Sequence, residues 1–426
     1  MKILVLGTGA REHALAWRLR QDPEVHALVI APGNAGMARG LGKGARLLPV
    51  NLTNPAEIVE LARAEHVDLT VVGPELPLAA GVVDRFQAER LPIVGPTAVA
   101  ARLETSKAFA KAFMERHGIP TARFLVARSA GEALAAVRDN ALGWPLVIKA
   151  DGLAGGKGVV IALDPAEAES AVREAMVDRR FGDAGGTVVF EQCLRGPEVS
   201  VFALSDGTAA RVLLSAQDHK RAFDNDEGPN TGGMGAFAPS PLYTPEVDAR
   251  VRAEIIEPVI AGMRAEGHPY TGFLYAGLML TADGPKVIEF NSRFGDPEAQ
   301  VVLPALSGPF ARVLMAAAEG RLASAPRLEW NGEVFAGVVL ASGGYPGTFE
   351  SGMPIRGLDA DHGDALVFHA GTALEDRGFV TAGGRVLTVV GRGPTFKGAI
   401  DRAYHAASKI TFDRMHFRKD IGRSAL

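Results

Sequence analysis

The chain has 426 residues, a formal net charge of −4 and one cysteine, Cys193. This charge indicates neither a nucleic-acid nor a membrane-surface partner. A single cysteine excludes an intramolecular disulfide and fits a reducing compartment. The apolar run at the N-terminus is too short for a signal peptide, and no run has the length of a membrane span. We therefore expect a cytoplasmic globular protein of about three domains.

Residues 1–95 alternate between short apolar runs and helical patterns. The expected strands are Ile3–Leu6, Ala27–Ile30, Leu69–Val72 and Ile93–Val94, and the helical patterns include Pro55–Glu65 and Ala79–Glu89. This alternation predicts a doubly wound parallel sheet. Such sheets bind ligands at the carboxyl ends of their strands, where glycine-containing loops follow in this chain.

The first of these loops, residues 7–13, reads Gly-Thr-Gly-Ala-Arg-Glu-His and opens a predicted helix. Helix N-termini of this kind bind anions. As a dinucleotide fingerprint the loop is weak, because Glu12 stands where a third glycine is expected. The second strand also ends in Ala31-Pro32, where a ribose-binding acid would stand. A tight turn explains the pattern as well as ligand binding does.

Residues 105–190 follow a different scheme. A helix is expected over Ser106–His117, and further helices begin after capping residues at Ser129 and Asp164. Two strands, Pro145–Ala150 and Gly158–Leu163, lie between these helices. Residues 187–216 and 270–291 are typical of antiparallel strands.

The segment from Lys149 to Gly158 is rich in glycine and joins two of those strands. A phosphate-binding P-loop would continue with Ser or Thr and a helix after its lysine, but Gly158 and a strand follow Lys157. A glycine hairpin remains, whose backbone N–H groups can close over phosphates. Lys149 ends an apolar run and, if buried, needs an anion as partner. The alternative is a hairpin that carries two solvated lysines.

The stretch KVIEFNSRFGDPE near residue 289 carries the most functional information. As a strand it places four side chains on one face: Val287, Glu289, Asn291 and Arg293. A carboxylate and an amide oxygen suit Mg²⁺, which also takes phosphate ligands. An adjacent arginine can clamp the same phosphates. The alternative is a solvated polar strand face, but the combination favours a metal–phosphate site.

Two further segments are ambiguous. Residues 217–240 form an expected long loop that opens with Asp-His-Lys-Arg and closes with a glycine-rich run, which suits either a substrate loop or a solvated surface loop. His219 is a weak candidate for a general base. Glu191 and Glu198 stand at the two ends of a loop. Acids in a loop are usually solvated, so a functional role for these two needs other evidence. The tail from Glu333 carries no readable chemistry; its expected strands are Phe335–Ala341, Ala365–Ala370 and Arg385–Val390, with a helix near Pro394–Lys409.

Four motifs together carry a family resemblance: QDHKR (217–221), GPNTGGMGA (228–236), YTGFLYAGLM (270–279) and VIEFNSRFGDPE (287–298). The chain resembles the glycinamide ribonucleotide synthetases of the ATP-grasp superfamily over nearly its whole length. The resemblance implies a multidomain α/β and α+β fold. It comprises a doubly wound substrate-binding domain (1–103), an ATP-grasp core of two subdomains (104–325, with a smaller lid at about 121–192) and a small mixed C-terminal domain (326–426).

The resemblance also implies a nucleotide and metal site. ATP phosphates would contact Lys107 and Lys149 beneath the hairpin that contains Gly155, Gly156 and Lys157. Adenine would be bound by Glu191 and the backbone near Leu194, and ribose by Glu198. Glu289 and Asn291 would hold Mg²⁺ or Mn²⁺.

The implied substrates are glycine and 5-phosphoribosylamine. Phosphoribosylamine would face Gly9, Arg11, Glu12 and Glu75. Glycine and the transferred phosphate would face Arg293, Asp296 and a loop that contains Asp218, Lys220, Asn230 and Gly233. Of these residues Arg293 and Asp296, together with Lys149, would be catalytic. The chain departs from the family pattern at Thr8, Ala10, Gln192 and Ser292.

The implied reaction is ATP-dependent ligation of glycine to phosphoribosylamine through a glycyl phosphate, in purine biosynthesis. The enzyme would need no nucleic acid or membrane and would be a monomer or a weak homo-oligomer. Alternatives are another ATP-grasp carboxylate–amine ligase or carboxylase, a nicotinamide-dependent oxidoreductase that uses Gly7 and Gly9, and a nucleotide sensor that binds ATP without consuming it.

Overall fold

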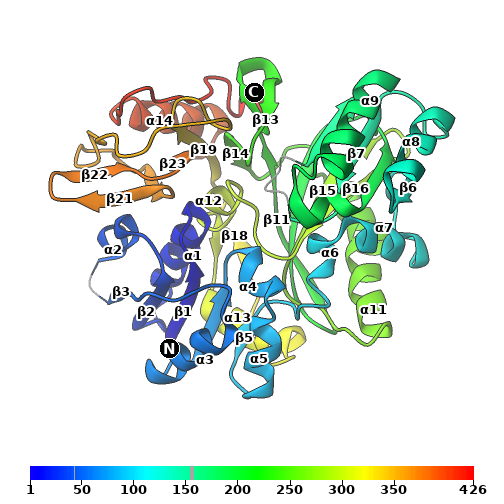
Figure 1. Cartoon of the computed structure of the whole chain (residues 1–426). Helices are drawn as coiled ribbons and strands as arrows, with labels where there is room; N and C mark the ends of the chain where they lie inside the picture. The colour runs from blue at the N-terminus through cyan, green and yellow to red at the C-terminus, as the bar shows by residue number, and fades with distance from the viewer. Residues whose placement is uncertain (43, 154–157) are drawn as a thin grey trace.

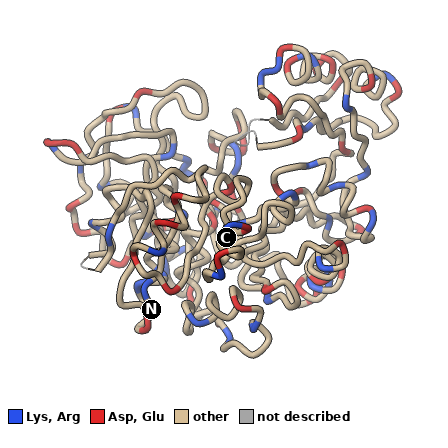
Figure 2. The backbone as a smooth tube through the Cα atoms, turned by 60° about the horizontal axis from the view of Figure 1, so that its bottom comes forward, with Lys and Arg blue, Asp and Glu red and all other residues tan. Residues whose placement is uncertain are grey.

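The computed structural model describes residues 1–42, 44–153 and 158–426. Figure 1 shows three lobes around a long central sheet: the N-terminal part below, the C-terminal part at the upper left and a smaller lobe, the lid, at the upper right. No helix in the described ranges is long and apolar enough to cross a membrane. Lys, Arg, Asp and Glu are interspersed along the whole chain (Figure 2), in keeping with its small net charge.

The N-terminal lobe is a parallel sheet of order β3-β2-β1-β4-β5, which confirms the doubly wound prediction. Its strands are β1 (Lys2–Gly7), β2 (Ala27–Pro32), β3 (Ala45–Leu47), β4 (Leu69–Val72) and β5 (Ile93–Val94); its helices are α1 (Ala10–Arg20), α2 (Ala35–Leu41), α3 (Pro55–Ala64), α4 (Glu75–Ala79) and α5 (Val82–Ala88). Ile3 and Val5 pack with α1 in one core, while Leu4 and Leu6 pack with α3 and α5 in another. The helix expected over 79–89 is wrong in its start, because Gly81 adopts a left-handed φ of 82° and separates α4 from α5.

The lid is an antiparallel sheet of order β6-β9-β7-β8. Its elements are β6 (Phe124–Ala127), α8 (Ala130–Asp139), β7 (Leu146–Ala150), β8 (Val159–Ala162), α9 (Pro165–Val172), η1 (Arg173–Val177), η2 (Gly182–Gly186) and β9 (Val188–Gln192). The predicted caps are confirmed, because the side chains of Ser129 and Asp164 accept hydrogen bonds from the N–H groups of Glu132 and Glu167. The predicted contacts of Gly155, Gly156 and Lys157 lie outside the described residues.

The central sheet has eight strands in the order β16-β15-β10-β11-β14-β19-β23-β20. These strands are β10 (Glu198–Asp206), β11 (Ala210–Asp218), β14 (Gly235–Ala238), β15 (Thr271–Thr281), β16 (Gly284–Asn291), β19 (Val334–Ala341), β20 (Leu366–His369) and β23 (Arg385–Gly393). Strands β14 and β19 pair antiparallel, with Phe237 opposite Ala336. One sheet therefore joins the expected ATP-grasp core to the C-terminal lobe, and the limits 1–103, 104–325 and 326–426 stay predictions.

Helices and small hairpins complete these lobes. The helices are α6 (Arg102–Thr105), α7 (Lys107–Arg116), α10 (Pro245–Val251), η4 (Arg252–Ile256), α11 (Glu257–Ala265), α12 (Ala299–Val302), α13 (Phe310–Ala318), η5 (Leu322–Ser324), α14 (Phe396–Ala407) and η6 (Arg423–Ala425). The small strands and the turn between two of them are β12 (Arg221–Phe223), η3 (Asp224–Asp226), β13 (Glu227–Asn230), β17 (Leu306–Ser307), β18 (Glu329–Trp330), β21 (Thr372–Glu375) and β22 (Gly378–Thr381).

The expectation of one long loop over 217–240 is wrong. Its first half is the β12–β13 hairpin, and β14 at its end joins the central sheet. The tight turn of the hairpin places Asn225 and Asp226 at φ values of 58° and 55°. Those residue types tolerate this left-handed conformation, but the same composition also suits a loop, which is why the pattern misled.

The predicted face of the 287–293 strand is also wrong in one respect. Gly277 of β15 lies opposite Glu289, but its neighbour Leu278 lies opposite Val287, so Ile288 is an extra residue in β16. This bulge turns Val287 into the same core as Phe290 and leaves Glu289 and Asn291 on the other side. Bulges re-aim side chains in this way and are frequent near active sites.

Candidate functional site

A group of lysines gathers around one carboxylate where the lid meets helix α7. Lys111 and Lys149 each place Nζ 2.8 Å from a different oxygen of Glu191. All three side chains are buried. Burial lowers the pKa of Lys111 to about 8, against the opposing effect of Glu191. Burial opposes ionisation of Glu191 as well, but the two lysines outweigh it and its pKa lies below the ordinary value. We call Lys107, Lys111, Lys149 and Glu191 the lysine end of the site.

Lys107 joins the lysine end because it contacts the first residues of the glycine-rich segment. Its Nζ donates to the carbonyl oxygen of Gly152 at 2.8 Å. The Asp151 carboxylate accepts from Ser106 Oγ at 3.1 Å and from the Ala108 N–H at 3.2 Å, at the N-terminus of α7. The start of α7 is therefore fixed to the first residues of the glycine-rich segment, where β7 ends.

Glu289 and Asn291 lie between the lysine end and Arg293. Lys149 donates to the Ile288 carbonyl at 3.1 Å, which fixes the bulge beside Glu289. Burial raises the pKa of the Glu289 carboxyl, but the nearby Lys220, Lys149, Lys107 and Arg293 lower it more. Glu289 is therefore ionised at neutral pH, and no described residue donates a hydrogen bond to it.

Arg293 is held by two carboxylates from the N-terminal side of the site. Its Nε lies 3.2 Å from Glu75 and its NH2 lies 2.9 Å from Glu104. Glu104 also accepts from the Ser292 N–H at 2.7 Å. Burial opposes the charge on Arg293, but Glu104 and Glu75 outweigh it and raise its pKa. This arrangement fixes the guanidinium in both position and orientation.

The first loop holds a buried carboxylate in a cradle of glycines. Glu12 accepts from the Gly9 N–H at 2.7 Å and from Arg11 Nε at 2.5 Å. A Cβ atom at Gly7 or Gly73 would overlap the Glu12 side chain. Glycine at the ends of β1 and β4 therefore leaves the space that Glu12 fills. Arg11 also donates to the Phe294 carbonyl, which brings the first loop to the end of β16.

Asp296 is bonded from the C-terminal lobe. Arg385, the first residue of β23, has its NH2 3.2 Å from Asp296 Oδ2. Gln300 donates to Asp296 Oδ1 at 2.7 Å. Burial opposes ionisation of Asp296, but Arg385, Arg11 and Arg293 help to lower its pKa. We call Arg11, Arg293 and Arg385, with Glu12, Glu75, Glu104 and Asp296, the arginine end of the site.

A mixed group beside Glu289 contains Asp218 and Lys220. Lys220 Nζ lies 2.6 Å from Glu198. The pKa of Asp218 is raised to about 7, chiefly by burial; Lys220 opposes this shift, and Glu298 and Glu198 contribute to it. Glu298, which is buried, accepts from Ser200 Oγ at 3.2 Å. The predicted residues Asp218, Lys220 and Glu198 therefore lie together.

In the described part of the chain, no hydrogen bond or ion pair links the side chain of Asn230 to either end of the site. The predicted adenine contact of the backbone near Leu194 stays a prediction. Asn230 lies on β13 opposite Arg221. Burial and the charge of Arg418 lower the pKa of His219 to about 4, so this ring is neutral at pH 7 and is not a ready proton carrier.

Four charged residues of the site were not predicted from the sequence: Glu104, Lys111, Glu298 and Arg385. Glu298 ends the 287–298 motif and could have been found there. Lys111 lies one helical turn after Lys107, on the same face of a predicted helix. Glu104 and Arg385 carry no local signal, because their partners lie 188 and 153 positions away in the chain.

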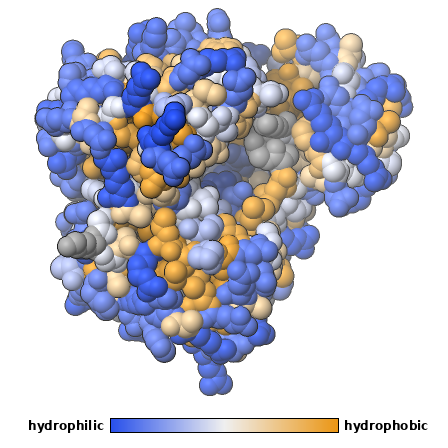
Figure 3. All heavy atoms as spheres, turned by 60° about the vertical axis from the view of Figure 1, so that its left-hand side comes forward, coloured by the Kyte–Doolittle hydropathy of each residue, from blue (hydrophilic) through white to orange (hydrophobic). Residues whose placement is uncertain are grey.

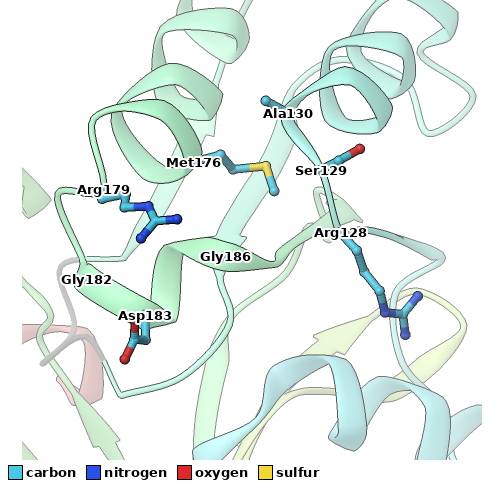
Figure 4. Close-up of a pocket in the computed structure, with 8 residues that line it drawn as sticks. All are labelled: Arg128, Ser129, Ala130, Met176, Arg179, Gly182, Asp183 and Gly186. Atoms are coloured by element: carbon cyan, nitrogen blue, oxygen red, sulfur yellow. The ribbon is translucent and has the colours of Figure 1, made fainter.

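The surface is hollowed between the lid and the rest of the molecule (Figure 3). The site residues come from both sides of this boundary, with Lys149 and Glu191 on the lid and Glu75 and Glu289 on the body. A separate hollow within the lid is lined by Arg128, Ser129, Ala130, Met176, Arg179, Gly182, Asp183 and Gly186. In Figure 4 Met176 points across this hollow toward the start of α8, while Arg128 points away. No predicted site residue lines it.

Comparison with known families accounts for almost the whole chain. Models of three domains of phosphoribosylglycinamide synthetase match it in order: the N domain over residues 1–104, the ATP-grasp (A) domain over 105–299 and the C domain over 335–424.

Individual proteins agree with this result. Phosphoribosylamine–glycine ligases of Ralstonia nicotianae and Chlorobaculum tepidum are each 50% identical over 427 and 429 residues, covering 100% of this chain and 100% of each relative. The crystal structure of the Thermotoga maritima phosphoribosylamine–glycine ligase has a TM-score of 0.85 at 34% identity, covering 99% of this chain and 100% of that chain. The biotin carboxylase domain of the Hydrogenobacter thermophilus 2-oxoglutarate carboxylase shares the fold at 19% identity, with a TM-score of 0.74 over 98% of this chain and 91% of that chain.

Proposed function

Because the chain belongs to the phosphoribosylglycinamide synthetase family, it is an ATP-dependent ligase that joins glycine to 5-phosphoribosylamine, and we propose that the reaction runs through a glycyl phosphate held between the lysine end and the arginine end. One observation supports this placement most strongly. Glu289 lies between the two ends and interacts electrostatically with Lys107, Lys149 and Arg293.

Glu289 and Asn291 hold a divalent cation, Mg²⁺ or Mn²⁺. Both side chains lie on the same side of β16, and Glu289 is ionised with no hydrogen-bond donor among the described residues. The described residues contain no group of three or more His, Cys, Asp and Glu that could hold a metal by themselves. Mg²⁺ commonly takes one or two protein oxygens and completes its shell with phosphates and water, so the donor set fits. When bound, the cation would neutralise charge on the ATP phosphates.

The lysine end binds the phosphates of ATP. Lys107 and Lys149 neutralise negative charge, and Glu191 holds Lys149 in place until the nucleotide arrives. Adenine lies near Glu191 and Leu194 and ribose near Glu198, while the expected phosphate contacts of Gly155, Gly156 and Lys157 fall outside the described residues. A carboxylate oxygen of glycine attacks the γ-phosphorus and ADP leaves, which gives glycyl phosphate. Positioning and charge stabilisation carry such a transfer, so no nucleophilic side chain is needed.

The arginine end positions the second step. Gly9, Arg11, Glu12 and Glu75 bind phosphoribosylamine, whose amine nitrogen attacks the carbonyl carbon of glycyl phosphate. Phosphate leaves, the attacking nitrogen loses a proton, and the amide of glycinamide ribonucleotide remains. Arg293 stabilises charge on the transferred phosphate in both steps. Glycine and the phosphate also contact Asp218, Lys220, Asn230, Gly233 and Asp296. The enzyme acts in the cytoplasm as a monomer or a weak homo-oligomer.

The test is release of ADP with Mg-ATP and glycine, with and without phosphoribosylamine generated in situ. We expect ADP release that needs both substrates and fails when alanine or serine replaces glycine. Release with another amino acid or with bicarbonate instead would contradict this assignment in favour of another ATP-grasp ligase or a carboxylase. ATP binding without release would indicate a nucleotide sensor.

A further inference from the structure

Arg385 of the C-terminal lobe contacts two predicted substrate segments at once. Besides its ion pair with Asp296, its NH1 donates to the Asp296 carbonyl at 2.7 Å and to the Gly232 carbonyl at 2.6 Å. A longer contact of 3.4 Å reaches the Gly233 carbonyl. One guanidinium thus bonds both Asp296, which is predicted to be catalytic, and the backbone at Gly232 and Gly233. These two residues belong to the segment predicted to bind the substrate glycine, which we call the glycine loop.

The glycine loop is closely fitted around these contacts. Tyr345, also of the C-terminal lobe, accepts a hydrogen bond from the Gly232 N–H at 3.0 Å through its hydroxyl. A Cβ atom at Gly232 would lie 3.0 Å from Arg385 Cζ, and one at Gly233, which has φ +110°, would overlap the Pro297 ring. Glycine at position 233 is therefore required where the loop passes Pro297, and glycine at position 232 leaves room for Arg385 and Tyr345.

The other end of the loop is anchored by the same lobe. Arg418, which is fully buried, donates to Asp226 at 2.7 Å and to the Arg221 carbonyl at 3.2 Å. The Lys419 N–H donates to Asp224 at 2.7 Å. Both the β12–β13 hairpin and the glycine loop that follows it are therefore fixed by residues beyond position 340.

We propose that Arg385 is a positioning residue for the ligase, which fixes the Asp296 carboxylate and the Gly232–Gly233 backbone in the arrangement that binds glycine. This inference rests on the proposed function. It assigns to the C-terminal lobe a direct part in the substrate site. Arginine suits the task because its planar fork serves a carboxylate and three carbonyls together, which a lysine ammonium cannot do in the same geometry.

The kinetic test compares Arg385→Ala, Arg385→Lys and wild type, with Arg392→Ala as the matched control. Arg392 lies on the same strand, is half exposed and pairs only loosely with Glu333 at 3.7 Å. We expect Arg385→Ala to raise the KM for glycine at least about tenfold while the KM for ATP stays within about twofold. Arg385→Lys should recover part of this loss and Arg392→Ala should behave as wild type. A KM for glycine within about twofold of wild type in Arg385→Ala would overturn the proposal.

Two further measurements keep the test decisive. If Arg385→Ala does not fold, Tyr345→Phe removes one hydroxyl from the same loop and should raise the KM for glycine in the same direction by a smaller factor; an unchanged value overturns the proposal. Wild-type protein without turnover would contradict the proposed function instead. In that case hydrogen exchange of residues 228–238 decides, because only Arg385→Ala, and not Arg392→Ala, should speed exchange there, and equal exchange overturns the positioning role.

Discussion

The two ends of the site are built from different cations, and their surroundings differ accordingly. At the lysine end, Lys111 and Lys149 share one carboxylate, Glu191, and contact it with single ammonium groups. At the arginine end, Arg293 bonds two carboxylates and Arg385 bonds a carboxylate and backbone carbonyls. The lysine end includes Lys149 and Glu191 of the lid, whereas the arginine end joins the N-terminal and C-terminal lobes to the end of β16.

This difference suits the two kinds of ligand. An ammonium group is a compact charge with rotatable donors, so a lysine can exchange Glu191 for a phosphate without a fixed angle of approach. A guanidinium that bonds several oxygens through its fork of N–H groups has a defined orientation, so the arginine end is arranged before substrate arrives. The arginine end should therefore tolerate a change of side-chain geometry at constant charge less well than the lysine end does.

The largest effect is expected where the two ends meet. Glu289→Gln keeps the shape of the side chain but removes the charge that faces Lys107, Lys149 and Arg293. We expect kcat to fall about 10²–10³-fold, comparable to the loss of one stabilising group in other active sites. Steady-state ADP release measures the change. Glu60→Gln, on the exposed face of α3, is the control, and near-normal turnover in Glu289→Gln would contradict the metal assignment.

A smaller loss is expected when the geometry of the arginine end changes at constant charge. Arg293→Lys keeps a cation but cannot bond Glu75 and Glu104 together. We expect kcat/KM to fall about 10–10²-fold. Unchanged kcat/KM in this variant would show that charge alone, and not the fork, is what the arginine end supplies.

The reverse substitution, lysine to arginine, should have a smaller effect at the lysine end. Lys107→Arg also keeps the charge, and its present contact is one bond to the Gly152 carbonyl. We expect the KM for ATP to rise less than about tenfold, because phosphate contact by a cation needs no fixed orientation at this position. A loss as large as that of Arg293→Lys would remove the distinction between the two ends.

Much of the fold was predictable because its signals are local. The caps at Ser129 and Asp164 and the apolar runs of the N-terminal sheet depend on neighbouring residues, and the structure confirms them. The site was predictable only where a motif places its residues together, as in 287–298. Arg293 and Glu75 lie 218 positions apart, so their contact follows from tertiary packing alone. The bulge at Ile288 likewise depends on pairing with β15, which a single strand does not encode.

The smallest effect concerns the contact behind the arginine end, where α1 meets the C-terminal lobe. His13 Nδ1 accepts from the His369 N–H at 2.9 Å, and both rings are buried. Burial lowers the pKa of His13 to about 3 and that of His369 to about 4. Their contribution to stability is therefore fully present above pH 6.5, the unfolded value, and is lost as the pH falls toward these lowered values.

Between pH 7 and pH 6 the expected loss is about 0.7 kcal/mol for each histidine, because only the unfolded state takes up a proton there. Thermal unfolding at pH 8, 7, 6 and 5 measures it. The His13→Asn variant removes one titrating ring, so its unfolding temperature should be lower throughout but should fall less steeply with pH than that of wild type. An equally steep fall in the variant would show that His13 makes no proton-linked contribution to stability.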